Sequence, residues 1–206
     1  MSTPSPLIHI VDDDESLRVA LLRLLGAAGF EARGYASTGD FLLQPLPDRP
    51  GCLLLDVRMP GPSGLDLQAA LRRQGNPLPV IFLTGYADVA ASVRAMKAGA
   101  VDFLTKPVER EALFEALQRA LARDATQRAA HMEAERLRAA FAALTPRERA
   151  VFDRIVAGQI NKQIADALGI AERTVKLQRA RLMTKLDVGS VAELGRLAER
   201  LRHLTD

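Results

Sequence analysis

The sequence predicts an α/β domain followed by a small all-α domain. Two observations support this order: short apolar runs alternate with longer helical patterns over the first 120 residues, and no strand pattern follows Leu144. Alternation of this kind is typical of a doubly wound parallel sheet covered by helices on both faces. The five strand-like runs span residues 7–11, 31–35, 52–55, 80–84 and 102–105.

Helical patterns separate and follow these runs. The clearest of them span residues 16–28, 64–73, 87–98 and 110–123. From Glu111 to Leu144 the chain contains neither Pro nor Gly, which predicts one long helix or two abutting helices that connect the domains semi-rigidly. Its leucines at four-residue spacing, Leu113, Leu117 and Leu121, fit packing onto the first domain or a coiled-coil partner.

We therefore divide the chain into a first domain at residues 1–123, a helical linker at 124–143 and a second domain at 144–206. The second domain opens with Thr145-Pro146-Arg147-Glu148, the sequence of a capping box with proline at the first helical position. Glycine breaks then predict four short helices, over residues 147–157, 162–168, 172–186 and 191–201.

Composition excludes several classes of protein. The chain has 206 residues, of which 48% are hydrophobic and 26% charged, as in a globular protein with a sizeable core. One cysteine, Cys52, and three scattered histidines provide neither a disulfide framework nor a zinc site. Because the sequence shows no export signal and no apolar stretch long enough for a membrane span, we expect a cytoplasmic protein.

Charge differs between the two parts of the chain. Residues 1–124 carry 13 Lys and Arg against 15 Asp and Glu, whereas residues 125–206 carry 15 against 10. Different partners are therefore expected for the two parts. Because a small positive excess is also typical of a solvated surface, nucleic-acid binding has to be decided by motifs.

Polar side chains gather where the predicted strands end. Asp12 and Asp13 follow the first strand, Asp56 closes the third, Thr84 closes the fourth and Lys106 follows the fifth. Because parallel strands present their carboxyl ends at one edge of the sheet, we expect these side chains to meet there. The two aspartates after the first strand, taken alone, would also fit a solvated turn that caps a helix.

Clustered carboxylates need a cation, and hard oxygen ligands with open positions suit Mg²⁺ or another divalent cation together with a phosphate. With the cation in place, Asp56 could act as a nucleophile toward a phosphoryl group. Lys106 would then act as a point charge on that group and Thr84 as a hydrogen-bond donor.

These residues resemble the motifs of a two-component receiver domain over residues 7–123. The motifs are His9-Ile10-Val11-Asp12-Asp13, Asp56-Val57-Arg58-Met59-Pro60 with Gly64, Thr84-Gly85 and Lys106-Pro107. The resemblance implies a flavodoxin-like fold in which Asp56 accepts phosphate from a sensor histidine kinase. It also implies that Asp12, Asp13, Asp56 and the backbone carbonyl of Arg58 bind Mg²⁺.

The same resemblance implies a switch made of Thr84 and Phe103. In that class of protein, the threonine moves toward the phosphate, the aromatic side chain follows, and a surface that here runs from Val89 to Pro107 is remodelled. Ordinary core packing is the alternative role for Phe103.

Two bulky residues are predicted to flank the phosphoryl group. Arg58 and Tyr86 each lie two positions beyond a pocket residue and could obstruct the water that hydrolyses an acyl phosphate. We therefore expect a long-lived phosphorylated state. The alternative is that both are surface residues without this role.

In the second domain, a helix, a glycine turn and a second helix are predicted over residues 162–175 and beyond. Small Ala165 permits close helix approach, Gly169 permits a left-handed turn and Val175 seals the packing. An ordinary helical bundle could contain the same pattern. Basic residues on the exposed face of the second helix, Lys176 and Arg179 among them, favour a helix that enters the major groove.

This domain resembles the LuxR/FixJ class of four-helix DNA-binding domains from about Leu144 to Ala198. The resemblance rests on Leu144-Thr145-Pro146-Arg147-Glu148, Gly158, Asn161-Lys162, Ile164-Ala165, Leu168, Thr174-Val175-Lys176 and Lys185-Leu186. It implies that Lys176, Leu177, Arg179 and Ala180 face base edges of double-stranded DNA, with Lys162, Thr174 and Lys185 nearer to phosphates.

Two residues depart from that pattern. Ala171 stands where a serine usually caps the recognition helix, and Glu172 could partly replace the cap through the helix dipole. Gln178 stands in place of a common histidine, so the base preference at that position cannot be borrowed.

Together the two domains resemble a response regulator of the FixJ/NarL type, which is not a turnover enzyme. The resemblance implies that phosphorylation promotes a homodimer through the surface from Val89 to Pro107, and that the dimer binds DNA and regulates transcription with RNA polymerase, as an activator. A dehalogenase-like phosphohydrolase would need a second aspartate where Arg58 stands. A DNA-binding or interaction protein that works without phosphorylation is the remaining alternative.

Overall fold

The computed structural model describes residues 4–75, 78–85 and 89–203. The chain divides into two compact units, Met1–Ala129 and Ala130–Asp206. One continuous helix, α5 (Arg110–Ala142), belongs to both units. Of the two predicted forms of this stretch, the single long helix is therefore the one observed.

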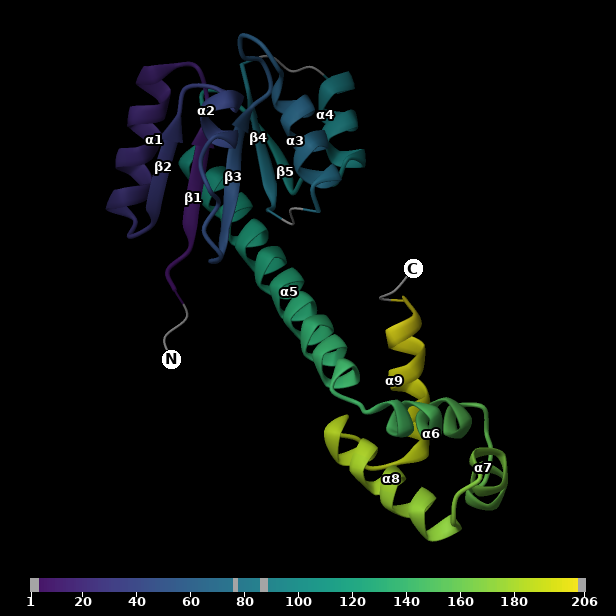
Figure 1. The fold of residues 1–206 in the computed structure, drawn as a ribbon. Coiled ribbons are helices and arrows are strands. Elements are labelled where there is room, and N and C mark those ends of the chain that lie inside the picture. The colour runs from purple at the N-terminus through teal and green to yellow at the C-terminus, as the bar shows by residue number, and fades with distance from the viewer. Residues whose placement is uncertain (1–3, 76–77, 86–88, 204–206) are drawn as a thin grey trace. The chain divides into compact units, whose positions relative to one another are not determined.

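The first unit contains a parallel sheet with the strand order β2-β1-β3-β4-β5 (Figure 1). The strands are β1 (Leu7–Val11), β2 (Glu31–Tyr35), β3 (Gly51–Asp56), β4 (Val80–Thr84) and β5 (Asp102–Thr105). They agree with the five predicted strands within one residue at each end. From β1 the chain first adds β2 on one side and then crosses over to add β3, β4 and β5 on the other, so the topological switch point lies between β1 and β3.

Helices cover both faces of this sheet, which confirms the doubly wound, flavodoxin-like fold (Figure 1). They are α1 (Glu15–Ala27), α2 (Thr38–Leu42), α3 (Gly64–Arg73), α4 (Val89–Lys97) and the first part of α5. The short helix α2 was not among the predicted helical stretches. At five residues, it is too short to produce a helical period that sequence alone would reveal.

Alternate residues of each central strand enter two separate apolar layers, because successive side chains in a strand point to opposite faces. Ile10 and Leu54 pack with α1 and α5, whereas Leu53 and Leu55 pack with α2, α3 and α4. The leucines of α5 that repeat every four residues lie in the first layer, with Leu113 and Leu117 fully buried. They pack onto their own domain, as the first of the two predicted roles requires.

The second unit consists of α6 (Pro146–Val156), α7 (Asn161–Leu168), α8 (Glu172–Lys185), α9 (Val191–His203) and the last part of α5. The predicted capping box starts α6: the Thr145 side chain accepts from the Glu148 N–H, and the Glu148 carboxylate accepts from the Thr145 N–H. Leu137 of α5 is buried in the core of this unit, and Phe141 packs against it. The end of the linker helix is therefore built into the helical domain.

Among the described residues, no helix is both long and apolar enough to cross a membrane.

Candidate functional site

Four predicted pocket residues meet at the carboxyl edge of the sheet. Asp12 and Asp56 follow directly after Val11 and Leu55, which are paired partners in the adjacent strands β1 and β3. Thr84 ends β4, and the Lys106 N–H donates to its carbonyl at 2.6 Å. The strand order thus brings together residues that lie up to 94 positions apart.

The carboxylates form one cluster. Single carboxylate oxygens of Asp12, Asp13 and Asp56 lie within 4.8 Å of one another. Asp12 and Asp56 are buried, whereas Asp13 is exposed. Burial raises the pKa of the Asp12 carboxyl and outweighs the opposing hydrogen bonds from Lys106 and from the Asp14 N–H. The cluster therefore has a strong electrostatic requirement for positive charge.

Lys106 supplies part of that charge. Its ammonium lies 2.6 Å from Asp12 Oδ2 and 2.6 Å from Asp56 Oδ2. Burial lowers the pKa of Lys106, but the hydrogen bonds to the two carboxylates outweigh this effect, so the net pKa is raised. One ammonium against three carboxylates leaves room for a divalent cation in the charge balance.

The donor set fits Mg²⁺. All three side chains offer hard oxygen ligands, and the exposure of Asp13 leaves the cluster accessible to an ion that keeps part of its water shell. The Arg58 N–H donates to Asp56 Oδ1 at 3.0 Å, so the backbone of Arg58 lies against the predicted phosphoacceptor. Coordination by the Arg58 carbonyl remains a prediction.

The two residues predicted to form a switch differ in burial. Thr84 is buried, and Phe103 is half-buried with its ring 6.1 Å from that of Phe82. Phe103 packs against the apolar layer of one sheet face, so its position fits both the switch and the core-packing roles. Tyr86, predicted to flank the phosphoryl group with Arg58, lies outside the described residues; Arg58 itself is exposed.

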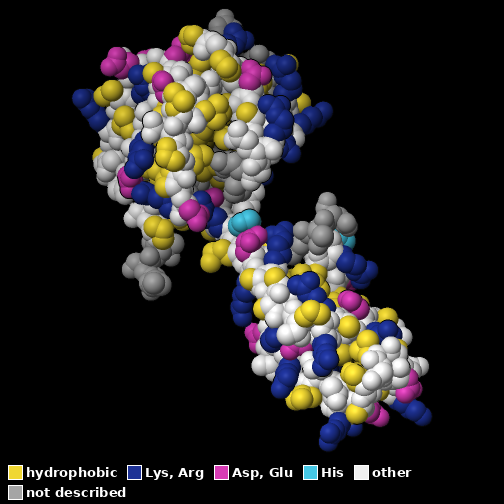
Figure 2. Space-filling model, viewed as in Figure 1, with side chains coloured by type: hydrophobic (Ala, Val, Ile, Leu, Met, Phe, Trp, Pro, Cys, Tyr) yellow, Lys and Arg dark blue, Asp and Glu magenta, His cyan; other side chains and the backbone are white. Residues whose placement is uncertain are grey.

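The helix-turn-helix in the second unit has the predicted geometry. Ala165 and Val175 are buried between α7 and α8, and Gly169 ends α7 with φ 65°, the left-handed conformation that glycine favours. Ala171 provides no side-chain cap to α8, as its residue type implies, and Glu172 occupies the first turn. Figure 2 shows Lys and Arg side chains on the visible face of this unit, with apolar side chains among them.

The residues predicted to contact DNA differ in solvent exposure. Exposed members of the set are Lys162, Lys176, Leu177, Ala180 and Lys185. Thr174 and Arg179 are half-buried, and Arg179 Nη1 donates to Asn161 Oδ1 at 3.1 Å. α8 therefore presents both charged and apolar groups, and Leu177 is 49% exposed.

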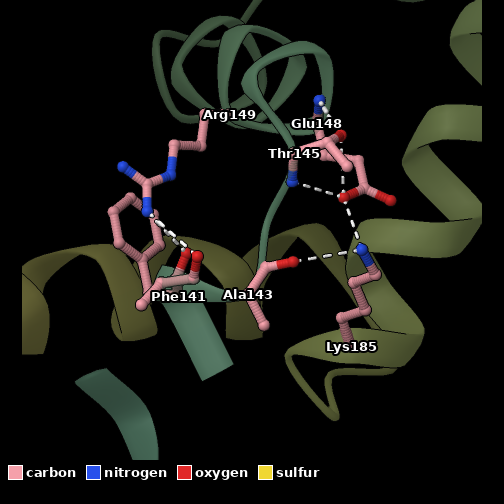
Figure 3. Close-up of polar contacts among 7 residues, drawn as sticks. Phe141, Ala143, Thr145, Glu148, Arg149 and Lys185 are labelled. Atoms are coloured by element: carbon pink, nitrogen blue, oxygen red, sulfur yellow. Dashed lines mark hydrogen bonds and ion pairs between the residues drawn. The ribbon is translucent and has the colours of Figure 1, made fainter. Parts of the chain in front are cut away.

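Lys185 has partners within the protein. Its ammonium donates to Glu148 Oε2 at 2.7 Å and to the Ala143 carbonyl at 3.2 Å (Figure 3). Sequence reasoning assigned Lys185 to the phosphate-facing set and did not find this pair. The capping-box position of Glu148 was visible in the sequence, but its second partner lies 37 residues away.

Family comparisons match both units. The family described as the response regulator receiver domain matches residues 8–118, and the family described as bacterial regulatory proteins, luxR family, matches residues 142–198. The fold and the motif positions thus define a receiver domain joined to a LuxR-type DNA-binding domain.

Named relatives align with this chain along most of their length. Nodulation protein W of Bradyrhizobium diazoefficiens is 43% identical over 95% of this chain and 86% of that protein. Response regulator protein TodT of Pseudomonas putida is 40% identical over 98% of this chain and 89% of that protein. The solved structure of the response regulator StyR superposes with a TM-score of 0.85 at 44% identity, covering 96% of this chain and 100% of StyR.

The chain belongs to the response regulators that combine a receiver domain with a LuxR-type helix-turn-helix domain. The resemblance drawn from its motifs is confirmed.

Proposed function

We propose that Asp56 accepts a phosphoryl group from a sensor histidine kinase. The observation that carries this proposal is the placement of Asp56, buried beside the Lys106 ammonium at 2.6 Å and within 4.8 Å of the Asp12 and Asp13 carboxylates. In the transfer, the P–N bond of a phosphohistidine breaks, an O–P bond forms on Asp56, and the imidazole keeps the electron pair.

The remaining pocket residues neutralise and orient the phosphoryl group. Lys106 neutralises the added phosphoryl oxygens, and the Thr84 hydroxyl donates to one of them. Asp12, Asp13, Asp56 and the Arg58 carbonyl hold the divalent cation, which when bound screens the carboxylates from the incoming anion. Movement of Thr84 toward the phosphoryl group opens space that Phe103 fills.

The proposed output is a homodimer that binds DNA. Val93 and Met96 of α4 are 46% and 47% exposed, and they lie on the surface from Val89 to Pro107 proposed for dimerisation. Two copies joined there present two α8 helices to half-sites about one DNA turn apart. Each α8 reads bases with Lys176, Leu177, Arg179 and Ala180, while Lys162, Thr174 and Lys185 form the phosphate-facing set.

This assignment places the protein in the cytoplasm, where it meets its kinase and promoter DNA. Its action on transcription is that of an activator that contacts RNA polymerase, and it does not turn over a substrate as an enzyme does. The exposed Arg58 side chain is proposed to slow hydrolysis of the acyl phosphate by obstructing water.

Acetyl phosphate with Mg²⁺, followed by intact-mass measurement, tests the central step. We expect wild-type protein to gain one phosphoryl group and Asp56→Asn to gain none. DNA binding and size should both change with phosphorylation. A protein that stays unmodified but binds the same DNA would instead identify the alternative, a regulator that works without phosphorylation.

A further inference from the structure

The end of the long helix α5 is capped by side chains from other helices. A helix leaves its last four carbonyl groups without partners within the helix, and α5 has no basic residue in its last turn. Arg149 Nη2 of α6 donates to the carbonyls of Phe141 and Ala142, each at 3.3 Å. Lys185 Nζ at the end of α8 donates to the carbonyl of Ala143 at 3.2 Å. Two cations of the helical domain thus complement the negative end of the linker helix.

Lys185 is also bound to a buried acid. Glu148 is 2% exposed, and its Oε2 accepts from Lys185 at 2.7 Å, from the Thr145 N–H at 2.8 Å and from Thr145 Oγ1 at 3.0 Å. The hydrogen bonds from Lys185 and Thr145 lower the pKa of Glu148, so it is ionised at neutral pH. A single carboxylate oxygen therefore joins the start of α6 to the end of α8 (Figure 3).

An aromatic contact supports the same junction. The Arg149 guanidinium lies over the Phe141 ring at 5.0 Å from its centroid, and that ring meets Phe152 edge-on at 5.2 Å. Figure 3 shows Arg149 and Lys185 reaching the end of α5 from two different helices. The last turn of the linker, the start of α6 and the end of the recognition helix are consequently fixed to one another.

We propose that Lys185 and Glu148 are positioning residues that set the recognition helix α8 against the end of the linker helix, and that Lys185 does not neutralise a DNA phosphate. The ammonium has three N–H donors, and two of them are used by Glu148 and Ala143. Taking it to a phosphate would leave the buried Glu148 carboxylate without its cation, which is unfavourable. This inference rests on the proposed DNA binding by α8, and it revises one residue of the proposed contact set.

The two roles of Lys185 predict opposite changes in DNA affinity for one variant. Glu148→Gln removes a negative charge and releases Lys185. If Lys185 were a phosphate contact, this variant would bind DNA more tightly, because the freed ammonium would be available to it. If the pair positions α8, the variant binds its site more weakly although the protein is more positive.

The salt dependence of DNA affinity is a second measurement, and a smaller fraction of folded protein would not change it. Each phosphate contact contributes about 0.9 to the slope of log affinity against log salt concentration. We expect Lys185→Met to lower affinity about tenfold, the size of one charged hydrogen bond, with the wild-type slope. Lys162→Met, which removes an exposed lysine of α7 from the proposed phosphate-facing set, is the matched control and should reduce the slope by about 0.9.

The experiment uses full-length protein, phosphorylated with acetyl phosphate, and a duplex selected by the wild type from random sequence. Affinities of Glu148→Gln, Lys185→Met and the double variant are measured over a range of salt, with circular dichroism to confirm folding. The double variant should bind no more weakly than the weaker single variant, because both remove the same interaction.

A reduced slope in Lys185→Met, or tighter binding by Glu148→Gln, would overturn the inference. Failure of the wild type to select any duplex would instead contradict the proposed DNA binding itself.

Discussion

Gly64 lies against the main-chain carbonyl of Asp56. A Cβ atom built on Gly64 would lie 2.1 Å from that oxygen, far inside van der Waals contact. The Gly64 N–H donates to the carbonyl of Val57, so the start of α3 is held against the loop that follows Asp56. Glycine is required there because any side chain would displace the backbone of Asp56.

Gly64→Ala should therefore destabilise the receiver domain by about 2 kcal/mol through overpacking. The matched control is Gly26→Ala, because Gly26 lies inside α1 and a Cβ atom added to it would meet nothing within 4 Å. That control should raise stability by up to about 1 kcal/mol, the difference in helix propensity. Urea unfolding of both variants measures the effects, and similar values for the two would contradict the steric explanation.

Stability should depend on pH through His9. Burial, together with the positive charges of Arg33 and Arg49, lowers the pKa of His9 to about 4. In the unfolded chain the pKa of histidine is about 6.5, so between these values the unfolded state binds more protons and stability rises with pH, by at most about 1.4 kcal/mol per pH unit. The Nδ1 atom lies 3.0 Å from the Tyr35 hydroxyl, which fixes the ring.

Urea unfolding from pH 4 to pH 7 tests this dependence. His9→Leu should flatten the rise in stability over this interval, whereas His131→Leu, at an exposed histidine, should retain it. An undiminished rise in His9→Leu would show that other groups cause the pH dependence.

Arg128 anchors the part of α5 that extends beyond the sheet. It donates to the buried carboxylate of Asp124 at 3.0 Å, to Asp48 at 2.6 Å and to the Arg49 carbonyl at 2.5 Å. Asp124 also accepts from the Gly51 N–H at 3.1 Å. Arg128→Ala leaves a buried carboxylate short of a partner and should lower the unfolding free energy by about 2 kcal/mol.

Hydrogen exchange shows which part of the chain is destabilised in Arg128→Ala. Amides of residues 124–129 should exchange faster in Arg128→Ala, because the anchor of this helical segment is removed. Arg136→Ala is the control. The side chains of Arg136 and its ion-pair partner Asp187 are 72% and 86% exposed, and their nitrogen and oxygen atoms lie 3.3 Å apart. Such an exposed pair contributes at most about 1 kcal/mol. Unchanged exchange at 124–129 would contradict the anchoring role.

Met96→Glu should prevent dimerisation of the phosphorylated protein. Met96 is 47% exposed on α4, and a charge at the centre of a shared apolar contact is desolvated without a partner. The control Leu43→Glu also replaces an exposed apolar side chain by a carboxylate. Leu43 is 80% exposed and lies outside the proposed surface, so this variant should dimerise like the wild type. Sedimentation after phosphorylation distinguishes the two, and a dimer in Met96→Glu would exclude this surface.

The sequence by itself determined the succession of strands and helices except for the short helix α2, the presence of the acidic pocket and the helix-turn-helix. Each rests on local information: apolar runs of strand length, aspartates that follow strands, and a glycine turn between two short helices. Even Gly64, whose close contact was not foreseeable, stood in the motif that identified the receiver.

Only the tertiary structure decided which distant groups pair. Lys185 was predicted from its residue type and helix position as a phosphate contact, and its partners Glu148 and Ala143 lie 37 and 42 residues away. Arg128 and Asp48 meet across 80 residues in the same way. The physical reason is that helix periodicity fixes the face on which a charged side chain stands, whereas the packing of other helices decides whether that face meets water, DNA or a buried carboxylate.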